Sequence, residues 1–220
     1  MPGTNTLLGV GLAVVVALAI VLIVLLSGGG GGAGDVTAAD VTKVRQAMTA
    51  AGCTFVERPA EAAAHVSRDD RHSYASFPPT SGAHDGSTTT IWGNYRTPVD
   101  PRQAVHNLEH GGVVVWYGPD ISAEDRERID AFYDDSPNGV VVTPIPDPFE
   151  GVTYPKHEPL GSRVAISVWT APERTPDQGT TYVSVCPSVD VAAFGTFRDT
   201  FRGKGRERVP TSSQTPGVVG

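Results

Sequence analysis

The chain has little cysteine and little positive charge. Of its 220 residues only two are cysteines, and 17 Lys and Arg stand against 24 Asp and Glu, for a formal net charge of −7. The only basic run, residues 202–208, is short and does not alternate with aromatic residues. Nucleic-acid binding is therefore not expected. The sequence also lacks the internal repeats that indicate a solenoid or propeller.

The two cysteines, Cys53 and Cys186, lie near opposite ends of the part of the chain that we expect to fold. Disulfides persist outside the cytoplasm. In the chain-entropy model, a bridge that closes a loop of this size stabilises a domain by up to about 4–5 kcal/mol. Two unrelated buried thiols are the alternative, because Cys also packs as a small apolar side chain. We predict a Cys53–Cys186 disulfide in an extracytoplasmic domain.

Charge is absent from the first 34 positions, where Leu7–Leu26 form an unbroken apolar run without proline. About twenty residues are enough for a helix to span the hydrocarbon core of a membrane. A cleaved signal peptide has a shorter apolar core and a small-residue cleavage site, so an uncleaved anchor is favoured. We predict a single-pass anchor in the cell membrane over residues 1–26 and a glycine-rich linker over 27–34. The flanking charges do not decide its orientation, whereas the cysteines favour a C-terminal domain outside.

The remaining chain is long enough for one domain with its own core. Apolar periodicity and capping residues predict four helices, and short apolar runs predict three strands. The expected helices are Asp35–Ala51, Pro101–His110, Ser122–Tyr133 and Val189–Arg202, and the expected strands are Val113–Tyr117, Val140–Pro144 and Arg163–Thr170. This order predicts the α+β class, as a single compact domain (35–208) with a small mixed sheet and flanking helices. Residues 209–220 are predicted to be a disordered tail.

Histidine is concentrated in one stretch, since four of the six fall between His72 and His110. In a helix, His106 and His110 share a face, which is the geometry that places two imidazoles on one metal ion. His84, after a Ser-Gly turn, is the third candidate ligand, and His65 ranks before His72 as the fourth. Because no thiolate is nearby, an imidazole-binding transition metal, copper or zinc, is expected.

Two other interpretations of this cluster remain open. His106-Asn107-Leu108-Glu109-His110 matches the H-x-x-E-H string of inverted zinc peptidases, in which the glutamate is the general base. Glu109 would then be the catalytic residue of a metal-dependent hydrolase, although a glycine pair and a strand follow at once. Alternatively, the histidines are structural, because a histidine at a helix end can satisfy its last carbonyls. The chain would then be a non-catalytic accessory domain that docks on a partner complex in the membrane.

Several motifs resemble a known family. They are Pro78-Pro79-Thr80-Ser81-Gly82 followed by His84, the Leu-Glu-His-Gly string at 108–111, and the Phe-Arg-x-x-Phe-Arg-Gly-Lys-Gly segment at 197–205. Together they resemble the bacterial domain-of-unknown-function family 3105, over roughly residues 50–208. The resemblance implies a membrane-anchored domain that faces outward, and it implies no particular activity. Its implied polar positions are His65, His84, His106, Glu109 and His110.

Overall fold

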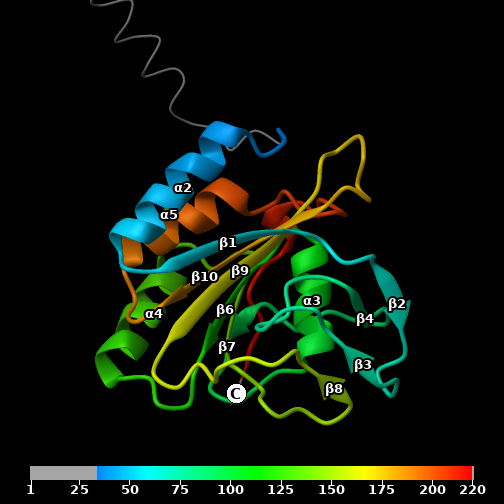
Figure 1. The fold of residues 1–220 in the computed structure, drawn as a ribbon, viewed down its shortest axis with the longest axis horizontal. Coiled ribbons are helices and arrows are strands. Elements are labelled where there is room, and N and C mark those ends of the chain that lie inside the picture. Colours follow the sequence, from blue (N-terminus) through cyan, green and yellow to red (C-terminus); the bar gives the residue numbers. More distant parts are fainter. Residues whose placement is uncertain (1–33, 220) are drawn as a thin grey trace, which may run out of the picture. The chain divides into compact units, whose positions relative to one another are not determined.

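A six-stranded mixed sheet forms the centre of the computed structural model, which describes residues 34–219 (Figure 1). The strand order is β1-β10-β9-β6-β7-β5, with β6, β7 and β5 parallel and the other neighbours antiparallel. In that order the strands are Thr54–Pro59, Thr180–Cys186, Val164–Thr170, Val113–Tyr117, Val140–Pro144 and Gly93–Asn94. The predicted bounds of β6 and β7 are confirmed, while β1, β5 and β10 had not been predicted.

Four α-helices accompany this sheet within the described residues, which confirms the α+β class. They are α2 (Ala38–Ala50), α3 (Pro101–Glu109), α4 (Ala123–Asp135) and α5 (Val191–Phe201). Capping side chains set all four starts: Thr37, Asp100, Ser122 and Asp190 each accept a hydrogen bond from a backbone N–H in the first turn. The predicted helices therefore all exist, with ends that differ by at most three residues.

The sheet is covered on both faces, as strand β6 illustrates. Val113, Val115 and Tyr117 pack into the hydrophobic cluster that contains residues of α2, α4 and α5. Val114 and Trp116 point the other way, into the cluster that contains α3. Figure 1 shows the same arrangement, with α2 and α5 side by side on one face and α3 on the other. Because alternate side chains of a strand face opposite sides, a strand buried on both sides has to be apolar throughout.

Two small parallel sheets lie on the α3 side of the domain (Figure 1). One pairs β2 (Ala64–Val66) with β4 (Ala83–Asp85), and the other pairs β3 (His72–Ser73) with β8 (Val152–Thr153). In the first of these sheets, His65 lies directly opposite His84. Strands of two or three residues carry too little periodicity to be recognised in a sequence, yet this pair positions two of the candidate ligands.

The predicted disulfide is present. It joins Cys53, just before β1, to Cys186, the last residue of β10, over a sequence separation of 133 residues. Both cysteines are buried beside the cluster that contains α2 and α5. The bridge therefore ties together the two outer strands at one edge of the main sheet.

The C-terminal residues differ from the prediction of a disordered tail over 209–220. Thr211–Ser213 form a short 3-10 helix, and the following Gln214 is 1% exposed. The Gln214 side-chain amide donates hydrogen bonds to the carbonyl oxygens of His110 and Val209. The segment is ordered because this polar side chain is buried and anchored at the end of α3.

The N-terminal predictions fall almost entirely outside the described residues. This applies to the membrane anchor over 1–26 and to the linker over 27–34, except for Gly34. Residues 34–219 belong to one compact unit. Between residues 34 and 219, no helix is long and apolar enough to cross a membrane.

Candidate metal centre

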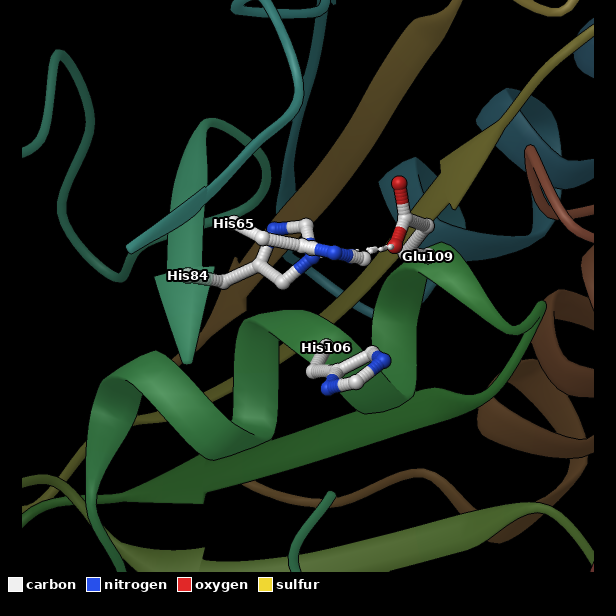
Figure 2. Close-up of side chains that lie close together, drawn as sticks. All are labelled: His65, His84, His106 and Glu109. Atoms are coloured by element: carbon white, nitrogen blue, oxygen red, sulfur yellow. Dashed lines mark ion pairs between the residues drawn. The ribbon is translucent and has the colours of Figure 1, made fainter. Parts of the chain in front are cut away.

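Four side chains converge beside α3: His65, His84, His106 and Glu109. Each offers one ligand atom, and these atoms all lie within 4.8 Å of one another. Figure 2 shows the rings of His65 and His84 directed at the carboxylate of Glu109, with His106 on the same helix as that carboxylate. His84, His106 and Glu109 are buried, whereas the side chain of His65 is 56% exposed.

Two pieces of local structure bring the four side chains together. His106 and Glu109 are three residues apart on α3, and this spacing places them on the same face of a helix. The pairing of β2 with β4 places His65 opposite His84, and the centroids of their rings are 5.0 Å apart. The ring of His84 is also 4.9 Å from that of His106. The group therefore joins one helical face to one strand pair.

A hydrogen bond to the backbone fixes the orientation of His84. Its Nδ1 lies 2.9 Å from the carbonyl oxygen of Gly82, and a carbonyl can only accept. Nδ1 therefore carries a hydrogen, so a neutral ring holds its lone pair on Nε2. The turn that provides this carbonyl requires glycine, because Gly82 has a φ of +108°. The opposite nitrogen, Nε2, faces the carboxylate of Glu109.

Three buried polar atoms of the group lack a hydrogen-bond partner among the described residues: His84 Nε2, His106 Nδ1 and Glu109 Oε2. His84 Nε2 and Glu109 Oε2 are 2.9 Å apart, but they are not aligned as a hydrogen bond. An unsatisfied buried polar atom costs on the order of 1–3 kcal/mol, so such atoms are rare in folded proteins. A cation held between His84 Nε2 and Glu109 Oε2 would satisfy both of these atoms.

The electrostatics of the group favour an ionised Glu109 and an uncharged His106. Burial by itself raises the pKa of Glu109, but contact with His84 and the charges of Arg206 and His106 outweigh burial and lower the pKa to about 2. Burial also lowers the pKa of His106, and the neighbouring His110 and His84 lower it further. Metal ions bind ionised carboxylates and neutral imidazoles, so both groups are in the form that coordinates.

The separations also match a metal site. Zinc binds imidazole nitrogen and carboxylate oxygen at about 2.0–2.2 Å, which places tetrahedral ligand atoms roughly 3.3 Å apart. The Oε2 atom of Glu109 is 2.9 Å from His84 Nε2 and 3.6 Å from His65 Nε2. Small side-chain shifts therefore suffice to enclose an ion. Three nitrogens and one oxygen suit zinc or copper better than the hard cations magnesium and calcium.

His110 lies outside this group, contrary to the expectation that it would share a metal with His106. Helix α3 ends at Glu109, so His110 is the C-cap residue. Its ring centroid is 4.5 Å from that of His106, but its Nε2 lies 2.9 Å from Glu207 Oε2. His72 is also elsewhere, on β3, with its ring against Tyr74. The carboxylate of Glu207 thus binds His110, one of the predicted ligands, outside the group.

Sequence reasoning missed the C-terminal contribution to the site. Arg206 Nη1 donates to Glu109 Oε1 over 3.2 Å, although the two residues are 97 positions apart. The sequence had indicated only that residues 202–208 are basic and that residues 197–205 resemble a family motif. The available signal was the pair of glycines at 203 and 205, which allows a close approach of the backbone beside charged side chains.

The description "Protein of unknown function (DUF3105)" belongs to the family model that matches residues 65–172. Residues 65–172 of the chain belong to this family. The matched range contains all four residues of the group, whereas Arg206 and Glu207 lie beyond it. No curated protein and no solved structure matches the chain significantly.

Proposed function

We propose that this domain binds a transition metal ion, zinc or copper, through His65, His84, His106 and Glu109, and handles that metal outside the cytoplasm. The observation that carries the proposal is the convergence of these ligand atoms, of which His84 Nε2 and Glu109 Oε2 are buried without a hydrogen-bond partner among the described residues. The pairing of Cys53 with Cys186 supports an oxidising location. The apolar run near the N-terminus would hold the domain at the cell membrane as a single-pass anchor.

Binding, storage or transfer fits the geometry better than catalysis. Four protein ligands complete a tetrahedral site, whereas catalytic zinc sites have three protein ligands and an open position. The exposure of His65 gives the site one accessible side, while the other three ligands are fixed in the interior. An outward movement of the His65 side chain would open a route by which a metal ion enters and leaves the site.

The hydrolase alternative has less support from the contacts of Glu109. A general base needs a carboxylate oxygen free to face a water molecule. Oε1 of Glu109 pairs with Arg206, and Oε2 faces His84 and His65. His110, the second histidine of the peptidase-like string, is paired with Glu207. These contacts favour Glu109 as a ligand.

The docking alternative needs a contiguous exposed apolar surface. Over residues 34–219, only Ile91, Val191 and Val218 are large hydrophobic side chains with substantial exposure. Three such side chains do not amount to a docking patch, so the exposed surface gives the docking alternative no support.

Metal content decides the proposal. The full chain would be purified in mild detergent, stripped with a chelator, and titrated with Zn²⁺ and then with copper ions, with elemental analysis of the product. We expect one tightly bound equivalent in the wild type and none in the double variant H84A/H106A. The matched control is H157A, which removes a histidine that pairs with Asp147 elsewhere in the domain. Failure of the wild type to retain metal, or equal retention by the double variant, would refute the proposed function.

A further inference from the structure

The segment that follows α5 returns to the C-terminal end of α3, where Glu109 is located. The backbone N–H of Gly203 donates to the carbonyl oxygen of Gly111, and that of Glu207 donates to the carbonyl oxygen of Glu109. Between them, a Cβ at Gly205 would collide with the backbone of Gly111 and Glu109. Only glycine permits so close an approach, so the sequence specifically places residues 203–207 against the candidate site.

Two consecutive side chains of this segment then contact two consecutive residues of the site. Arg206 lies 3.2 Å from Glu109 Oε1, and Glu207 lies 2.9 Å from His110 Nε2. We propose that Arg206 and Glu207 are positioning residues that select the ligands of the metal site. Arg206 would leave Glu109 a single coordinating oxygen, and Glu207 would keep His110 from coordinating. This inference rests on the proposed metal binding.

Arg206 acts on the carboxylate of Glu109, which has two oxygens that could coordinate an ion. Glu109 is 1% exposed, so water cannot fix its orientation. With Oε1 held by the guanidinium, Oε2 alone is presented to His84 and His65. Without Arg206, the carboxylate is free to rotate or to chelate the ion through both oxygens. Partners of this kind that orient ligating residues typically change metal affinity 10- to 100-fold when they are removed.

Glu207 acts on His110, a fourth histidine close to the site. The ring centroids of His110 and His106 are 4.5 Å apart. At this distance a change of side-chain rotamer would bring His110 to the ion that His106 binds. Its contact with Glu207 turns Nε2 away from the group. Because both side chains of this pair are partly exposed, the pair contributes little to stability. Glu207→Gln should therefore leave the fold intact while freeing His110.

The experiment uses the full chain in detergent, loaded with Co²⁺, whose visible spectrum reports the number and type of ligands. Zinc affinity is measured in parallel by competition with a chromophoric chelator. We expect R206Q to weaken zinc binding 10- to 100-fold and to change the Co²⁺ spectrum, and R206K to recover part of both. We expect E207Q to change the spectrum through recruitment of His110, and the double variant E207Q/H110A to restore the wild-type spectrum.

The control is K204Q, which removes one positive charge from the same segment at a side chain that forms no ion pair with the metal group among residues 34–219. Circular dichroism checks the fold of every variant, and R206K serves if R206Q does not fold. A wild type that binds metal while R206Q and E207Q match K204Q in affinity and spectrum overturns this inference alone. A wild type that binds neither Zn²⁺ nor Co²⁺ overturns the proposed function as well.

Discussion

The Nε2 atom of His84 lies 2.9 Å from the Oε2 atom of Glu109, and both side chains are almost completely buried. The other ring nitrogen of His84 already donates to the carbonyl oxygen of Gly82. A neutral His84 therefore directs a lone pair at a carboxylate, which is repulsive. Either a second proton on the ring or a cation between the two atoms removes the repulsion. The proposed metal site rests on this relationship, because a cation bound between the two atoms would satisfy both.

Single histidine substitutions should distinguish the residues that bind the metal from a histidine that only lies nearby. H84A or H106A should abolish zinc binding, because each removes a buried nitrogen that has no other partner in the described part of the chain. H110A should change affinity only a few-fold, since His110 pairs with Glu207. Isothermal titration with Zn²⁺, alongside circular dichroism of each variant, measures this. Loss of binding in H110A comparable to that in H106A would restore His110 to the ligand set.

The substitution E109Q tests whether Glu109 is a ligand or a base. The amide keeps one oxygen but loses the negative charge that faces His84 and Arg206. We expect zinc affinity to fall at least about 10-fold, as expected when a charged ligand of the metal is replaced. Competition titration against a chelator of known affinity gives the ratio. Unchanged affinity together with loss of a hydrolytic activity would instead identify a general base.

Acid should destabilise the metal-free domain through Glu109. Its pKa in the fold is about 2, below its ordinary value of 4.5, so the folded state favours the ionised carboxylate. The resulting stabilisation is complete above pH 4.5 and is lost as the pH falls from 4.5 towards 2. At 1.36 kcal/mol per pKa unit, the loss is roughly 3 kcal/mol.

Urea unfolding in the presence of a chelator, repeated from pH 6 to pH 3, measures this loss. E109Q should flatten the profile below pH 4.5. The matched substitution E57Q, in an exposed pair with Arg45, should not change it. Parallel profiles for the wild type and E109Q would show that Glu109 is not stabilised as the carboxylate. The pKa of His106 is lowered by burial, so its protonation below its ordinary pKa of 6.5 adds a loss in the same direction.

Much of the fold could be predicted because its main strands are apolar on both faces. Strands β6 and β7 are short runs dominated by valine, and their ends match the prediction. Strand β1 was missed because Glu57, Arg58 and Pro59 interrupt its pattern, which an edge strand tolerates. Capping residues such as Asp100 gave the helix starts, because their chemistry is local.

The candidate site was predictable only where its residues are close in sequence. The density of histidine pointed to His84 and His106, and helical spacing placed Glu109 near them. The same spacing misled for His110, because the helix ends one residue earlier and Glu207 captures the ring. The contact between Arg206 and Glu109 depends on how α5 returns the chain to α3, which no local pattern reveals.

Removing the disulfide should weaken the domain without rearranging it. Cys53 and Cys186 are buried and close a loop of 133 residues, so the chain-entropy model gives a loss of about 4–5 kcal/mol for the C53S/C186S variant. Urea unfolding with and without reductant measures the loss. Alkylation of the native, non-reduced protein followed by mass spectrometry should show no modified cysteine. Two alkylated thiols would contradict the bridge and count against the proposed extracytoplasmic location.

The C-terminal residues should contribute to stability through Gln214. Its side-chain amide donates to the carbonyl oxygens of His110, over 2.7 Å, and Val209, and its backbone carbonyl accepts from Gly139 N–H. Q214A would remove these side-chain hydrogen bonds and leave the partly buried carbonyl oxygen of His110 without its donor. We expect a loss of about 1–3 kcal/mol in the free energy of unfolding.

Deletion of residues 209–220 should cost more than Q214A, because it also removes the hydrogen bond from Gly217 N–H to the carbonyl oxygen of Trp92. The matched control is S212A, an exposed position in the same 3-10 turn, which should change the unfolding free energy by less than about 0.5 kcal/mol. Urea unfolding of the three variants gives the comparison. Since Gln214 is bonded to the cap of α3, the deletion should also weaken zinc binding at His106. A deletion variant as stable as the full chain would mean that the tail is dispensable, as a disordered segment would be.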